Sequence, residues 1–121
     1  MYTPTVLIAT TPAVWTTLPG ASWVWESDAR SEGVFTFLGT FTVPGWALAS
    51  IMSVKLTIAA DDVFKVKFNG VVIAPQWTGG YTQVMTFELK PWLQGSLPNR
   101  LDITVKNTQY MGGLLYKVEI T

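Results

Sequence analysis

The chain has 121 residues, a length typical of one domain, and its eight Lys and Arg residues balance eight Asp and Glu residues. With zero net charge, it has no basic field to attract nucleic acid or an anionic membrane. It contains no Cys, which excludes disulfides and thiolate metal sites, and no His, which removes the commonest general base and transition-metal ligand.

The surface of this small domain is expected to carry few charges. Charged residues make up 13% of the chain and hydrophobic residues 49%, whereas ordinary soluble domains have about 25% charged residues. A nearly neutral, weakly charged surface favours association. We therefore expect a homo-oligomer or a larger protein assembly. The alternative is a monomer whose neutral surface is rich in Thr, Ser and Gly.

The sequence shows no membrane-spanning segment and no export signal. Its most apolar region, residues 43–54, is too short to cross a bilayer and is interrupted by Pro44 and Gly45. The first residues lack a positively charged region ahead of an apolar core. We expect no membrane insertion, and a location outside the cell or on a virion surface that is reached without a signal in this chain.

Short apolar runs and alternating segments predict eight to ten strands in chain order. The candidate ranges are 5–9, 13–18, 23–25, 33–43, 52–58, 64–68, 71–74, 84–89, 101–106 and 114–120. Residues 47–51 are expected to form a loop or a single helical turn, and residues 90–95 a short helical turn. We expect one domain spanning residues 1–121, in which residues 1–20 form an N-terminal arm or an edge strand.

The cleanest alternation lies in residues 33–43, where Phe and Val face one way and Thr the other. Gly39 falls in the apolar register, and we expect a β-bulge there. Trp23, Trp25 and Trp92 are expected to lie in the core, because large aromatic side chains fill the interior of a small sandwich.

A β-hairpin is the strongest local prediction. Residues 64–68 alternate between apolar side chains and the lysines Lys65 and Lys67, so one face should be buried and the other solvated. Asn-Gly at 69–70 follows directly, and this pair favours the type I′ turn, which needs positive φ at both central residues. We expect Pro75 to end the second strand of the hairpin.

Many short strands without a long helix predict an all-β antiparallel sandwich. From Trp23 onward, the order of these signals resembles the galactose-binding-domain-like jelly roll. The matching segments are Trp23-Val24-Trp25, Phe41-Thr42-Val43-Pro44, Ala59-Ala60-Asp61-Asp62 with Asn69-Gly70, the turn that contains Gly95 and Asn99, and the closing strands 101–107 and 112–114. Leu97-Pro98 lengthen the usual turn, and residues 1–20 have no counterpart.

The resemblance implies a jelly-roll sandwich of the kind found beside catalytic domains in glycoside hydrolases, in carbohydrate-binding modules, and in some phage and surface proteins. It does not imply one function, because this fold hosts many binding and structural roles.

Aromatic residues are the richest functional signal in the sequence, because sugar rings stack their C–H faces on flat side chains. Trp77 and Tyr81 lie in a Gly-rich loop, Trp46 lies at a turn, and Tyr110 precedes Gly-Gly at 112–113. These four residues form our candidate glycan platform. The alternative is that they fill the core or an interface between subunits.

Carboxylates offer little for a metal or for catalysis. Asp61 and Asp62 are candidates for Ca²⁺, but calcium takes six to eight oxygen ligands, and we expect a strand-end turn instead. Glu26, Asp28 and Glu32 are expected to form a solvated loop rather than a catalytic pair. We therefore expect no cofactor and no enzymatic activity.

These observations favour a non-catalytic structural or adhesive subunit of a self-assembling surface structure, such as a virion, a filament or a cell-surface assembly. Residues 2–18 would pack on a neighbour by adding a strand to a sheet edge. The alternative is a free-standing carbohydrate-binding module. Nucleic acid is not expected, since Lys65 and Lys67 share a strand face with no aromatic residue between them.

Overall fold

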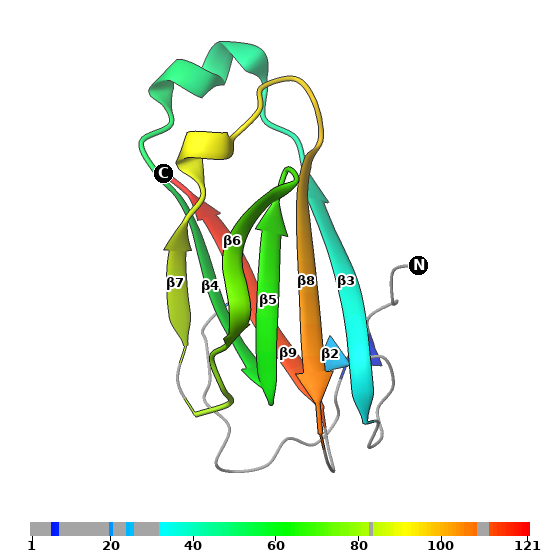
Figure 1. Cartoon of the computed structure of the whole chain (residues 1–121). Helices are drawn as coiled ribbons and strands as arrows, with labels where there is room; N and C mark the ends of the chain where they lie inside the picture. Colours follow the sequence, from blue (N-terminus) through cyan, green and yellow to red (C-terminus); the bar gives the residue numbers. More distant parts are fainter. Residues whose placement is uncertain (1–5, 8–19, 21–23, 26–31, 83, 109–111) are drawn as a thin grey trace.

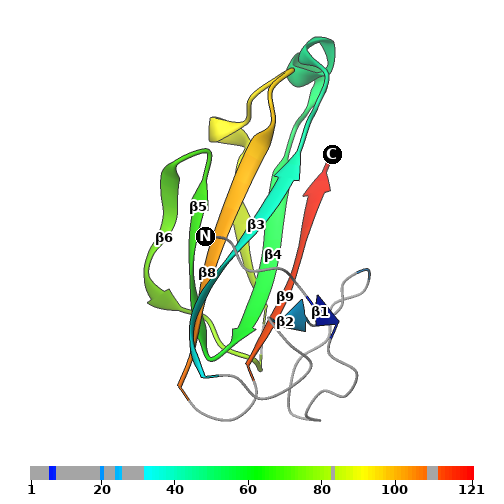
Figure 2. The same ribbon diagram turned by 90° about the vertical axis from the view of Figure 1, so that its right-hand side faces the viewer.

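The computed structural model describes residues 6–7, 20, 24–25, 32–82, 84–108 and 112–121. In this part of the chain, two antiparallel sheets pack face to face, which confirms the predicted all-β sandwich (Figures 1 and 2). None of the helices found there is long and apolar enough to span a membrane.

One sheet has five strands and the other has four. The five-stranded sheet contains, in spatial order, β1 (Val6–Leu7), β2 (Val24–Trp25), β9 (Gly113–Ile120), β4 (Val54–Asp61) and β7 (Met85–Glu88). The four-stranded sheet contains, in spatial order, β3 (Gly33–Phe41), β8 (Asn99–Asn107), β5 (Val63–Phe68) and β6 (Val71–Thr78). Two short 3₁₀ helices, η1 (Gly45–Ser50) and η2 (Lys90–Trp92), lie at the upper end in Figure 1.

The hairpin forms as predicted. Phe68 pairs with Val71 across the turn, and Asn69 and Gly70 have φ angles of 50° and 80°, which is the left-handed pair that a type I′ turn requires. The prediction for Pro75 is wrong, because β6 continues through this position to Thr78. The register between β5 and β6 shifts on this stretch, and an irregular edge strand tolerates a proline that a central strand would not.

The predicted bulge at Gly39 is also wrong, since β3 pairs with β8 in unbroken register and Gly39 lies opposite Leu101. The reason for a glycine here is space: a Cβ on Gly39 would lie 3.2 Å from the hydroxyl of Tyr116. The glycine lets a side chain of the five-stranded sheet approach the backbone of the other sheet.

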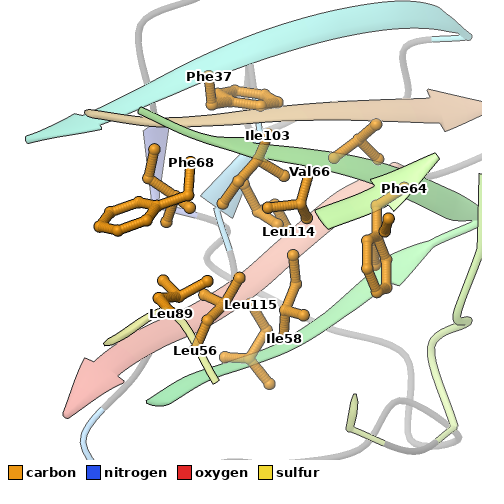
Figure 3. Close-up of a cluster of buried hydrophobic side chains, with 14 of the residues drawn as sticks. Phe37, Leu56, Ile58, Phe64, Val66, Phe68, Leu89, Ile103, Leu114 and Leu115 are labelled. Atoms are coloured by element: carbon orange, nitrogen blue, oxygen red, sulfur yellow. The ribbon is translucent and has the colours of Figure 1, made fainter. Parts of the chain in front are cut away.

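The core lies between the sheets and follows the predicted alternation (Figure 3). Phe64, Val66 and Phe68 of β5 point inward and are almost completely buried. Trp25 is fully buried, as predicted, with its ring centroid 5.2 Å from that of Phe35. The prediction for Trp92 is wrong, because its side chain, on the short helix η2, keeps 38% of its surface exposed.

Part of the expected N-terminal arm is described. β1 pairs with β2 of the same chain, Val6 opposite Trp25, so this piece is the edge of the five-stranded sheet. Trp23 and the predicted strand at 13–18 lie outside the described residues.

Side chains tie the neighbouring strands β5 and β8 together at one end. Asn69 donates to the backbone oxygen of Trp92 and to Oδ1 of Asn99, at 2.7 and 3.0 Å. Its own Oδ1 accepts the backbone N–H of Arg100 at 2.8 Å, and the backbone N–H of Asn69 is bonded to the oxygen of Arg100. Asn99 is fully buried and also binds both backbone groups of Gln94.

The other end of the same strand pair is closed by Asp62, which precedes β5. Its Oδ2 accepts the backbone N–H of Thr108 at 2.8 Å and the hydroxyl of Thr108 at 2.6 Å. Its own backbone N–H donates to the oxygen of Lys106. β5 and β8 are therefore fixed against each other at both ends.

Replacing Gly79 by alanine is expected to lower the free energy of unfolding by about 2–4 kcal/mol. Gly79 has a φ of +83°, and a Cβ there would overlap the ring of the buried Phe64. Urea unfolding followed by tryptophan fluorescence measures the change. Gly80→Ala is the matched control, because a Cβ at Gly80 meets nothing within 4 Å and should cost less than about 0.5 kcal/mol. Equal losses in both variants would contradict the packing described here.

Candidate functional site

The outer face of the four-stranded sheet gathers polar side chains from three strands. Because side chains alternate along each strand, burying Phe64, Val66 and Phe68 turns Lys65 and Lys67 outward. The register then places Lys65 opposite Thr104 of β8, and Thr104 opposite Thr36 of β3. The two threonine hydroxyls are 3.1 Å apart and share a hydrogen bond.

A shallow groove of about 500 Å³ runs over this face. Its polar and aromatic lining consists of Thr36, Lys65, Lys67, Trp77, Asp102 and Thr104. Hydroxyl, ammonium, carboxylate and indole groups therefore meet in one open depression, which is the arrangement expected of a site for a small polar ligand.

Trp77 is the single aromatic side chain among the described residues that line the groove, and it is half-buried. The Nζ atoms of Lys65 and Lys106 lie 4.5 and 5.4 Å from the centroid of its ring. Both distances are within the range of cation–π attraction, which contributes roughly 0.5–1 kcal/mol at exposed sites. Two strands thus hold the indole at the edge of the groove.

Positive charge is concentrated on this face although the chain as a whole is neutral. Four of the eight basic residues project from the outward positions of β5 and β8, namely Lys65, Lys67, Arg100 and Lys106. Asp102 is the single acidic residue at those positions, and its Oδ1 lies 3.7 Å from Nε of Arg100. This face therefore carries more positive than negative charge, and Lys65, Lys67 and Asp102 are the charged residues that line the groove itself.

The other three residues of the predicted platform do not join Trp77. Tyr81 is half-buried and packs against the core. Trp46 is 86% exposed on η1, at the upper end of the sandwich in Figure 1, whereas β6 carries Trp77 toward the lower end. Tyr110 lies outside the described residues. Among the described members of the platform, Trp77 alone lines the groove.

The candidate calcium ligands Asp61 and Asp62 lie at the junction of β4 and β5, where Asp61 is buried and a cis peptide bond joins the two. Burial alone would raise the pKa of Asp62, but the hydrogen bonds from Thr108 outweigh it and hold the pKa below its ordinary value, with help from Lys106. No group of three or more His, Cys, Asp or Glu side chains suited to a metal occurs in the part of the chain that the structure describes.

Sequence reasoning found Trp77 but missed Thr36, Asp102, Thr104 and Lys106. Their outward direction was readable, because β3 and β8 alternate clearly. Their proximity to Trp77 was not readable, since it depends on which strands are neighbours and in which register.

Comparison with solved structures identifies similar folds. The crystal structure of Streptomyces avermitilis alpha-L-rhamnosidase complexed with L-rhamnose matches with a TM-score of 0.65 and 21% identity, covering 93% of this chain and 13% of that one. A Bacteroides fragilis protein assigned as a beta-galactosidase matches with a TM-score of 0.48 and 13% identity, covering 71% of this chain and 15% of that one.

The likeness to the rhamnosidase establishes the β-sandwich fold. The chain spans a small fraction of the length of both matched proteins, so their catalytic activities are not transferred to it. No protein-family model matches the sequence, and no curated protein does.

The sandwich is expected to lose stability in acid partly through Asp62. The pKa of Asp62 in the folded state lies below the ordinary value of 3.8. Its contribution to the free energy of unfolding is therefore complete above about pH 4, and it is lost as the pH falls through the lower pKa of the folded state. The pKa of Glu88 is lowered by hydrogen bonds from Ser53 and from the backbone of Val54, so Glu88 also contributes stability that is lost in acid.

Asp62→Asn should therefore be less stable than the wild type at pH 7 and should lose less of its remaining stability between pH 5 and pH 2. Chemical unfolding at each pH measures both effects. Glu32→Gln, which removes an exposed carboxylate just before β3, is the control and should keep the wild-type profile. If Asp62→Asn kept the wild-type dependence of stability on pH, protonation of Asp62 would not contribute to the loss of stability in acid.

Proposed function

We propose that this chain is a non-catalytic carbohydrate-binding module whose ligand lies in the groove on the four-stranded sheet. The observation that carries the proposal is Trp77, half-buried among hydroxyl, ammonium and carboxylate groups. A sugar presents a C–H face that stacks on an indole and a rim of hydroxyls that hydrogen-bond to such side chains. The groove offers both kinds of contact on one rigid sheet.

The comparisons support this proposal more than they support a structural subunit. The rhamnosidase structure contains a sugar, and a sandwich of this size would form a minor part of such an enzyme. A non-catalytic role agrees with a sequence that has neither His nor Cys. Residues outside a pocket are poor candidates for a carboxylate pair, and Glu32 is exposed. A location outside the cell, where glycans are accessible, fits the same role.

The fold type proposed with this function is the galactose-binding-domain-like jelly roll. Supporting it, the chain crosses repeatedly between the two sheets: β3 is followed by β4 in the other sheet, β7 by β8, and β8 by β9. Such crossings are typical of double-sheet jelly rolls.

Assembly remains a second candidate function because of strand β3. It forms the edge of the four-stranded sheet, has nine residues without a charge, and exposes Val34 and Leu38. Natural edge strands are usually protected by charges, prolines or covering segments. An uncharged edge of this length is suited to pairing with a second copy of the chain.

Binding should depend on Trp77. Trp77→Ala is expected to weaken affinity for the best ligand of a glycan panel by at least about tenfold, since truncating a central aromatic contact typically has effects of this size. Isothermal titration measures the affinity, and thermal unfolding shows that the variant is folded. Trp46→Ala, which removes an exposed tryptophan at the other end, should bind like the wild type. A wild-type chain that binds no member of the panel would overturn the proposal.

If β3 mediates assembly, light scattering after size exclusion should show a multimer at high protein concentration. Leu38→Lys should shift the chain to a monomer, because a lysine on an edge strand opposes edge-to-edge pairing. Leu97→Lys, at an exposed leucine outside the strand, is the control and should leave the multimer intact. A monomeric wild type at every concentration removes this candidate.

A further inference from the structure

We propose that the groove selects an anionic glycan, one whose sugar residues carry a carboxylate or a sulfate group. This inference rests on the proposed function and names the class of ligand. It follows from where the lysines stand relative to Trp77 and from what they lack as partners.

Ion pairs in the part of the chain that the structure describes join Arg100 to Asp102 and Lys117 to Glu119. Neither of these pairs includes Lys65, Lys67 or Lys106, although Lys67 lies opposite Asp102 in the strand register. Asp62 attracts Lys106 at longer range, but its carboxylate already accepts two hydrogen bonds from Thr108. An anion entering the groove would supply the missing charge.

Two of these cations lie next to the ring of Trp77, which is the proposed stacking surface. The ammonium groups of Lys65 and Lys106 both stand within about 6 Å of its ring centre. A sugar that stacks on the indole must therefore place its substituents beside at least one ammonium group. For a neutral sugar this costs part of the cation–π contact, whereas an acidic sugar replaces that contact with a stronger ion pair.

The strands that carry these cations are fixed by the scaffold before a ligand binds. Lys65 and Lys67 belong to β5 and Lys106 to β8, and this strand pair is fixed at one end by Asn69 and at the other by Asp62. A preorganised site loses less conformational entropy when the ligand binds. Charge placed on a rigid sheet also discriminates between anionic and neutral ligands more sharply than charge on mobile loops.

A nucleic acid fits these observations less well than a glycan does. Single-strand binders stack successive bases on several aromatic residues along a basic channel, but Trp77 is the one aromatic side chain that the described residues contribute to this groove. Asp102 also lies in the groove, where it would repel a phosphate backbone. The same carboxylate accepts hydrogen bonds from sugar hydroxyls.

The test compares polymers that share a backbone and differ in whether they carry acidic groups. Homogalacturonan oligosaccharides carry carboxylates, and their fully methyl-esterified forms are neutral with the same backbone. Dextran sulfate and dextran form the corresponding sulfate pair. Isothermal titration of the full chain should give at least about tenfold tighter binding to the charged member of one pair, with affinity that falls as salt increases. The preferred pair identifies carboxylate or sulfate as the recognised group.

Variants assign the selectivity to the groove. Lys65→Gln and Lys106→Gln should each reduce the preference for the charged polymer about three- to tenfold while retaining stacking on Trp77. Lys90→Gln is the matched control, because it removes the same charge from the exposed helix η2 and should leave the preference unchanged. Preference lost equally in all three variants would mean that net charge acts rather than the groove, and would overturn the inference.

The remaining outcomes separate the inference from the proposed function. Equal, Trp77-dependent binding of charged and neutral polymers overturns the anionic selectivity and leaves a carbohydrate-binding module. No Trp77-dependent binding to any glycan, charged or neutral, overturns both. A single-stranded oligonucleotide that binds as tightly as the preferred polymer would show a general polyanion site and would also overturn the inference.

Discussion

The hydrogen bonds that close both ends of the β5–β8 strand pair are the constraint on which the functional face depends. Asn69 holds one end through Arg100 and Asn99, and Asp62 holds the other through Thr108. Between these closures the register is continuous. A slip by one residue would turn every lysine of β5 into the core and every core phenylalanine outward. The same bonds that fix the fold therefore fix the strand positions from which the lysines project on the groove side.

The motifs that resemble the galactose-binding-like fold acquire a physical meaning from this arrangement. The Asn-Gly turn at 69–70 and the later turn with Asn99 are far apart in the sequence, yet the two asparagine side chains are 3.0 Å apart. Asn99 is buried, and its amide satisfies backbone groups that no strand pairs. Asn69 serves two purposes in the first turn: it adopts a positive φ, and its side chain binds the neighbouring strand.

Much of the fold could be predicted from the sequence because period-2 alternation reports burial directly. Prediction from the sequence failed where contacts with residues distant in the sequence decided the local structure. Gly39 suggested a bulge, but the glycine makes room for Tyr116 of the other sheet. Pro75 suggested a strand end, but an irregular edge strand tolerates it. For the site, Trp77 was found by its residue type, whereas Lys106 and Thr104 required knowledge of strand neighbours that a single sequence does not contain.

The net charge of the sequence also fails to predict the charge of one sheet face. A net charge of zero describes the electrostatic attraction that the molecule exerts at distances beyond the screening length of about 8–10 Å. A ligand within the groove instead meets Lys65, Lys67 and Asp102, and two further cations, Arg100 and Lys106, project from the same two strands. Acidic residues elsewhere on the surface are screened from it, so a neutral chain can hold a locally cationic face. Such a distribution keeps non-specific attraction of polyanions low at long range while preserving a local positive charge at contact.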